Sequence, residues 1–93
     1  MNKPEKFVPG RIVATPGVLT AFTEAGDVPS AYLVRHIAGD WGEVNAEDRR
    51  TNEESLVRGE RLLSVYRMSN GTKFWIITEW DRSATTFLLP EEY

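Results

Sequence analysis

The sequence contains no cysteine and only one histidine, His36. The lack of cysteine excludes disulfides, zinc–thiolate sites and a cysteine nucleophile. Asp40 and Glu43 have no second histidine near them, so we expect no metal site. Neither Ser64 nor Ser83 lies in a nucleophile-elbow motif. No cofactor motif is present, and we therefore expect no bound cofactor.

Long apolar runs and strong net charge are also lacking. No segment approaches the ~20 apolar residues that span a bilayer, and residues 1–10 have no apolar signal-peptide core. We therefore expect a cytoplasmic protein with no membrane partner. The net charge is −3 and the basic residues are dispersed along the chain, which argues against a stable DNA-binding protein. An RNA-cleaving site needs only a few local cations and is not excluded.

The chain has 93 residues, enough for a single domain over residues 1–93 with a modest core. Residues 1–10 are polar and hold two prolines, which indicates a loose N-terminal arm. The short apolar segment at residues 11–14 either adds a strand or leads into the first helix.

Three helices are predicted from their boundary residues. Thr15-Pro16 is typical of a helix start and Gly26 of a helix end. The segment Pro29–Ile37 reads as a second short helix. Asn45 caps a third, from Ala46 to Arg58, whose nearly all-polar surface places it on the outside of the molecule.

The last third of the chain predicts a three-stranded β-meander. A two-residue turn at Asn70-Gly71 would set Tyr66 opposite Trp75. A four-residue turn at residues 81–84 would set Glu79 opposite Thr86, whereas a three-residue turn would bring Thr85 beside Glu79. The first register makes one face almost wholly apolar and therefore the core side: Leu63, Val65, Phe74, Ile76, Trp80, Phe87 and Leu89. The expected fold is α+β, in the order β-α-α-α-β-β-β, with an antiparallel meander.

Four segments resemble a known group of proteins: RHIAGDWG (35–42), NEESL (52–56), GERLLSVY (59–66) and the run from Trp75 to Tyr93. The chain is similar, from Ile12 onward, to a family of small bacterial proteins of plasmids, integrative elements and prophages. Some of these are labelled as restriction methylase subunits, which does not fit a short chain without the methylase motifs. The resemblance implies a mobile-element accessory protein and brings no functional residue with it.

His36 is the first candidate for chemistry. Beside Arg35, it could act as a general acid or base with its imidazole oriented by Asp40. The alternative is a histidine at a helix end that interacts with the helix dipole and packs on Tyr32.

Asp40-Trp41 lies between two glycines. Trp41 could be a stacking surface or an anchor for a partner, since interface hot spots favour tryptophan. The alternative is an Asp-stabilised turn with Trp41 packed over the core.

Glu79, Arg82, Thr85 and Thr86 gather around the second turn of the meander. A cation, a hydroxyl and a carboxylate could together hold a phosphate group. A solvated turn with an ion pair explains the same residues.

Two functions follow, from different classes. The first is a non-enzymatic protein that binds another protein in host defence or plasmid maintenance, with Tyr66 and Trp75 exposed on the second sheet face; a homodimer through this face is a variant. The second is a metal-independent ribonuclease resembling the small RelE and barnase-EndoU-like toxins. In it His36 would be the acid/base, Arg35 and Arg82 would bind phosphate, and Thr85 or Thr86 would lie nearby.

Overall fold

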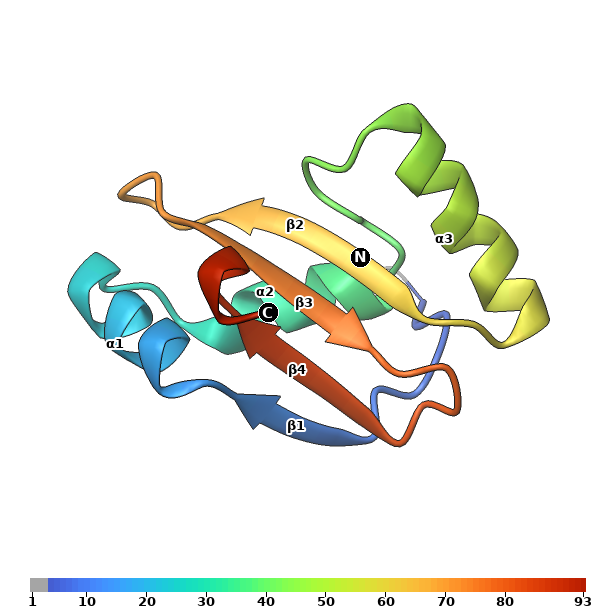
Figure 1. Cartoon of the computed structure of the whole chain (residues 1–93), viewed down its shortest axis with the longest axis horizontal. Coiled ribbons are helices and arrows are strands. Elements are labelled where there is room, and N and C mark those ends of the chain that lie inside the picture. The colour runs from blue at the N-terminus through green and yellow to red at the C-terminus, as the bar shows by residue number, and fades with distance from the viewer. Residues whose placement is uncertain (1–3) are drawn as a thin grey trace.

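The computed structural model describes residues 4–93. Its elements are β1 (Arg11–Ala14), α1 (Pro16–Ala25), α2 (Pro29–Ile37), α3 (Ala46–Arg58), β2 (Leu62–Arg67), β3 (Lys73–Thr78), β4 (Ala84–Leu88) and the 3-10 turn η1 (Pro90–Glu92). The predicted order of strands and helices is confirmed, and so is the α+β class (Figure 1).

The helix boundaries form through the expected local contacts. The Thr15 hydroxyl accepts a hydrogen bond from the Val18 amide, and α1 ends at Gly26 with a φ of 73°. The Asn45 side chain accepts from the Asp48 amide at 2.7 Å and begins α3. These side chains satisfy amides that the first helical turn leaves without a partner.

The sheet is mixed, with strand order β1-β4-β3-β2. The meander β2-β3-β4 is antiparallel, but β1 pairs with β4 in parallel. The segment 11–14 is therefore a fourth strand. It can be parallel because α1, α2, α3 and two strands separate it in sequence from its partner, a crossover long enough to bring the chain back in the same direction.

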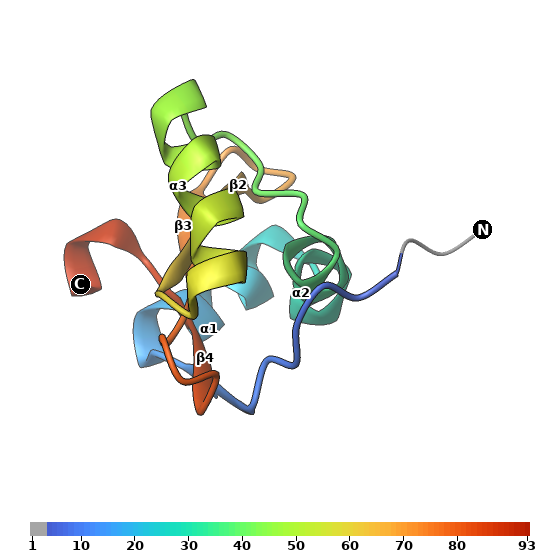
Figure 2. The same cartoon turned by 90° about the vertical axis from the view of Figure 1, so that its right-hand side faces the viewer.

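The two faces of the sheet are covered differently. Figure 1 shows α2 behind the sheet and η1 in front of it, and Figure 2 shows the same two elements on opposite sides of the edge-on sheet. Residues of α1 and α2 pack on one face, which we call the core face, around the buried cluster Val18, Ala21, Phe22, Tyr66, Met68, Phe74, Ile76 and Phe87. The other face, which we call the outer face, is covered in the described chain only in part, by η1.

The predicted register of the first hairpin is wrong by one residue. Tyr66 pairs with Phe74, because the Met68 amide donates to the Thr72 carbonyl and leaves a three-residue loop, 69–71. Met68 is buried in the core, and the Ser69 amide is held by Asp27 at 2.8 Å, so on the β2 side the hairpin closes one residue earlier, at Met68 and not at Ser69. A slip of one residue exchanges the faces of a strand.

The slip exchanges the faces of β2. Leu62, Ser64 and Tyr66 face the core, and Leu63 and Val65 do not belong to the core face as predicted.

The second hairpin is shifted by two residues, which preserves the faces. Glu79 bonds with Ala84 across the turn, so the loop is 80–83, and Thr86 lies opposite Ile77 instead of Glu79. Phe74, Ile76 and Phe87 are on the core face as expected. Trp80 is not: it is in the loop and 67% exposed.

The N-terminal arm is packed where the structure describes it; residues 1–3 of the predicted arm lie outside the described residues. The Lys6 amide donates to the Ile37 carbonyl, the Phe7 ring meets the His36 ring edge-on at 5.2 Å, and the Pro9 carbonyl accepts from Thr85 at 2.7 Å. Residues 6–9 therefore close one end of the core and are not loose.

The free edge of β2 is closed by other parts of the chain. Asn52, buried in α3, donates to the Leu63 carbonyl at 2.7 Å and accepts from its amide at 3.0 Å. Farther along, Val65 bonds to Trp41 and Glu43 through the backbone. Such cover removes a ladder of unpaired groups that would otherwise invite another strand.

No helix within residues 4–93 is long and apolar enough to cross a membrane.

Candidate functional site

His36 lies at the centre of a buried polar network. It has no exposed surface, and it is in the last turn of α2 facing the sheet. Its Nδ1 is 2.6 Å from the Ser64 hydroxyl and its Nε2 is 2.8 Å from the Thr78 hydroxyl. Thr78 in turn contacts Thr85 at 2.7 Å. Both ring nitrogens therefore bond to side chains of the sheet.

The direction of these hydrogen bonds follows from their last member. The Pro9 carbonyl can only accept, so Thr85 must donate to it. Thr85 has then used its one proton, so Thr78 donates to Thr85. Thr78 has likewise used its proton, and His36 must donate from Nε2. A neutral His36 then accepts at Nδ1 from Ser64. The structure thus specifies the Nε2–H tautomer.

Burial also decides the charge of this histidine. Loss of hydration, with a smaller contribution from the positive charge of Arg82, lowers the pKa of His36 from 6.5 to about 3. His36 is therefore neutral near pH 7. A catalytic acid or base must contact its substrate, and no surface of His36 is open to one. Tyr32, the predicted packing partner, instead contacts the core rings of Phe22 at a tilt and of Phe74 edge-on.

Arg82 ties together the loops at one end of the sheet. Its guanidinium donates to the carbonyls of Ser55, Glu60 and Glu79 at 3.1, 2.6 and 3.0 Å. It also lies 5.7 Å from the centre of the Phe7 ring, whose edge meets His36. Arg82 and His36 are thus near each other, but with Phe7 in contact with both. The Arg82 guanidinium is occupied by backbone carbonyls, and His36 is buried, so the two side chains do not form an open site for a phosphate group.

Asp40 orients the backbone and Arg35, not His36. It bonds to the Arg35 guanidinium at 2.8 Å and accepts from the Gly42 amide at 3.2 Å. Arg35 also lies 4.5 Å over the Tyr66 ring. Gly42 has a φ of 73°, and a Cβ there would lie 2.0 Å from the Val65 carbonyl. The turn therefore requires glycine, since any side chain would displace it from the edge of β2.

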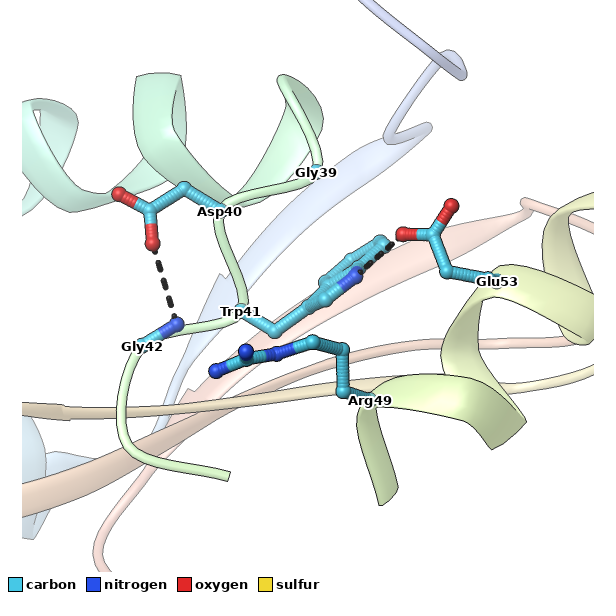
Figure 3. Close-up of a pocket in the computed structure, with 6 residues that line it drawn as sticks. All are labelled: Gly39, Asp40, Trp41, Gly42, Arg49 and Glu53. Carbon is cyan, nitrogen blue, oxygen red and sulfur yellow. Dashed lines mark hydrogen bonds between the residues drawn. The ribbon is translucent and has the colours of Figure 1, made fainter. Parts of the chain in front are cut away.

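Trp41 anchors this turn by packing its indole ring into the protein interior. It is 3% exposed, and its indole N–H donates to Glu53 at 2.8 Å (Figure 3). A shallow groove of about 340 Å³ runs beside it, lined by Gly39, Asp40, Trp41, Gly42, Arg49 and Glu53. The Trp41 ring stacks on Phe7 at 6.4 Å. Trp41 is therefore a core residue, and its indole ring offers little exposed surface for a partner.

A second shallow depression, of about 260 Å³, lies on the other side of the turn. It is lined by Arg35, Asp40, Gly42, Glu43, Val65, Tyr66 and Arg67. Tyr66 is only 1% exposed, because its hydroxyl donates to the Asp40 carbonyl and its ring faces the core. Burial raises the pKa of Tyr66. The expectation of an exposed Tyr66 is wrong, for it followed from the wrong register of β2.

The outer face carries the remaining candidates. Trp75 is partly exposed and its ring contacts that of Tyr93 at 5.5 Å. Arg61 donates to the Tyr93 hydroxyl at 2.8 Å and forms a looser ion pair with Glu79 at 3.5 Å. Thr86 lies on the same face, opposite Ile77. This cluster presents two aromatic rings and a cation on one surface.

The structure therefore divides the predicted residues into three places. Arg35, Asp40, Trp41 and Tyr66 meet at the turn along the β2 edge. His36 and Arg82 both contact Phe7. Trp75, Glu79 and Thr86 are on the outer face. Neither of the two depressions described above, which are formed by residues within 4–93, is lined by His36, Arg82 or Thr86.

Sequence reasoning missed two sets of residues. The first is the buried network around His36: Ser64 and Thr78 were not predicted to bond to it, and Thr85 was expected beside a phosphate group instead. The only signal of this network is hydroxyl residues recurring at core-facing strand positions once the register is known. The second is the pair Arg61 and Tyr93, which are 32 residues apart in sequence and meet only because η1 folds over β3.

No group of three or more His, Asp or Glu side chains that could hold a metal ion occurs within residues 4–93. No protein-family model, no curated protein and no solved structure matches this chain.

Proposed function

We propose that this chain is a non-enzymatic accessory protein of a mobile genetic element that binds a protein partner through the outer face of its sheet. The observation that carries the proposal is the pair of aromatic rings on this face. Tyr93 is 70% exposed and rests edge-on against Trp75, on a sheet face that in the described chain is covered only in part, by η1. Aromatic side chains on exposed surface are typical anchors of protein interfaces.

The charges around these rings indicate the chemistry of the partner. Arg67 and Lys73 lie opposite each other at one end of the outer face, beside Trp75. Arg67 is paired with Glu43 at 3.0 Å, whereas Lys73 is exposed and has no ion-pair partner among the described residues. Arg61 adds a cation at the Tyr93 ring. A partner segment with carboxylates flanking an apolar or aromatic side chain would complement this face.

The supporting context is the resemblance to small proteins of plasmids and prophages, where host-defence proteins and plasmid-maintenance factors are the partners to expect. The ribonuclease alternative has less support, because His36 is buried and Arg82 is occupied by carbonyls.

Affinity capture from the host tests the proposal. The wild-type chain is compared with Trp75→Ala and Tyr93→Ala, and with Val57→Ser, a change at an 87% exposed apolar residue of α3. We expect one acidic partner to be captured by wild type and by Val57→Ser and lost in both outer-face variants. Equal capture by all four folded proteins would refute the proposal, and cleavage of RNA by the wild type would favour the ribonuclease.

A further inference from the structure

The two edges of the sheet differ in how they are protected. The edge of β2 is covered by Asn52 and by the turn at residues 41–43. Within residues 4–93 the edge of β1 has no such cover: Figure 1 shows no helix or strand beyond it, and all but the last of its four residues are exposed. The strand carries Ile12, 46% exposed, and Val13, 39% exposed. It has no lysine, proline or bulge of the kind that blocks an edge.

The outward backbone groups of β1 can be identified from its bonds to β4. The Arg11 amide donates to the carbonyl of Ser83, just before β4, and the Thr15 amide donates to the carbonyl of Phe87 in β4. Because successive residues of a strand point their peptide groups to alternate sides, those of Ile12 and Ala14 point away from the sheet. Two amides and two carbonyls are therefore available at this edge.

These groups are self-complementary about a two-fold axis. If two β1 strands run antiparallel with the axis through Val13, Ile12 of each copy faces Ala14 of the other and exchanges both backbone hydrogen bonds with it. Val13 then lies directly opposite Val13 of the second copy. The sheet would continue without interruption from one copy into the other.

The same register brings opposite charges together. Arg11 falls opposite Thr15 of the second copy, and both side chains lie on the outer face with Val13. The Thr15 hydroxyl bonds to the Glu92 carboxylate, which η1 holds on this face. Those bonds lower the pKa of Glu92, so it is charged near pH 7. Each Arg11 would thus meet the carboxylate of the other copy, twice per dimer.

We propose that the chain pairs with a second copy of itself through β1, antiparallel and centred on Val13, to form a continuous eight-stranded sheet. This inference is independent of the proposed function, because it uses the edge of the sheet and not the rings of Trp75 and Tyr93. The two-fold arrangement leaves those rings uncovered on each copy's outer face.

A cysteine placed on the axis tests the register. The chain has no cysteine, so Val13→Cys introduces a single thiol. Opposed residues of a non-hydrogen-bonded pair lie about 4.5 Å apart at Cα, within the range that a disulfide bridges. We expect mild oxidation to convert Val13→Cys to a covalent dimer and to leave Ile12→Cys mostly monomeric, since Ile12 faces Ala14. Equal crosslinking of both variants, or none in Val13→Cys, would overturn the proposal.

Sedimentation of uncrosslinked protein provides the second measurement. Wild type should shift from monomer to dimer with rising concentration, and Arg11→Glu should associate several-fold more weakly, because it faces Glu92. The matched control is Arg50→Glu, the same charge change at an exposed position of α3. A wild type that stays monomeric at all concentrations, or an Arg11→Glu variant that associates like Arg50→Glu, would contradict the pairing.

Discussion

At the scale of single residues, His36 shows how burial decides between a catalytic and a structural role. Its residue type and its neighbours Arg35 and Asp40 are those of an acid/base site. Its position makes it a connector between α2 and the sheet, with its two ring nitrogens bonded to Ser64 and Thr78. The sequence could show the residue and not its depth, because depth depends on the register of β2 and on the packing of Phe7.

Removal of the imidazole should destabilise the fold. His36→Ala leaves a cavity and two buried hydroxyls without their partner, which we expect to lower the free energy of unfolding by about 3 kcal/mol. Urea denaturation measures this change. Val57→Ala, at an exposed site, should change it by less than about 0.5 kcal/mol. A His36→Ala variant as stable as wild type would show that the network contributes nothing.

The pKa of His36 makes stability depend on pH. The folded chain holds the pKa at about 3, against 6.5 for the unaffected group, so between these values the unfolded state binds a proton that the folded state does not. Stability is therefore full above pH 6.5 and falls as the pH falls, with a slope that approaches about 1.4 kcal/mol per pH unit. Denaturation curves from pH 7 to 5 should show this slope in wild type and a flatter one in His36→Asn.

The tautomer is a separate prediction of the network. Nitrogen-15 NMR at pH 7 should show one ring nitrogen of His36 protonated, at Nε2, because the Pro9 carbonyl fixes the direction of every bond in the chain. A proton on Nδ1 would mean that the network runs in the other direction. A ring charged at pH 7 would contradict its burial.

At the scale of elements, the helices were predictable and the strand registers were not. Thr15, Gly26, Asn45 and Gly59 mark helix ends by contacts within a few residues, which a sequence displays directly. The loop at 69–71 depends instead on a contact between Ser69 and Asp27, 42 residues away. With that distant contact the register of β2 differs by one residue from the predicted one, so Tyr66 is buried and Leu63 and Val65 lie half-buried on the outer face.

The parallel pairing of β1 was beyond sequence reasoning for the same reason. A short apolar segment fits a strand or the approach to a helix, and only the position of β4 distinguishes the two. The candidate site residues lie in separate places for the same reason, because the strand registers were not predictable. Residues close together in sequence, Arg35, Asp40 and Trp41, did meet at one turn, whereas Glu79 and Thr86 were separated by the true register.

Asn52 links α3 to the edge of β2, and a single substitution tests this contact. Its amide group satisfies both backbone groups of Leu63. We expect Asn52→Ala to lower the free energy of unfolding by about 2 kcal/mol, since it leaves part-buried backbone groups unpaired. Glu54→Ala, two residues on and exposed, is the control for loss of a polar side chain on α3. Equal stability of the two variants in thermal or urea unfolding would show that α3 is held by other contacts.

At the scale of the whole molecule, the fold separates stability from recognition. Helices α1 and α2, with the arm, bury one face of the sheet; α3 and the turn at residues 41–43 close one edge. The outer face and the edge of β1 are left open in the described chain. The first carries aromatic rings among cations, and the second carries backbone groups that a like strand can satisfy. We propose the first surface as the site of a protein partner and the second as the site of a second copy.

Site-specific photocrosslinking in the host cell tests whether the outer face binds a protein partner. A photoreactive phenylalanine analogue is placed at Tyr93 and, as the control, at Val57 on α3, both exposed. If the outer face binds the partner, the analogue at position 93 should form a covalent adduct with one protein, and Trp75→Ala should reduce the yield of that adduct. The analogue at position 57 should form no such adduct. An adduct formed from position 57 and not from 93 would contradict binding through the outer face.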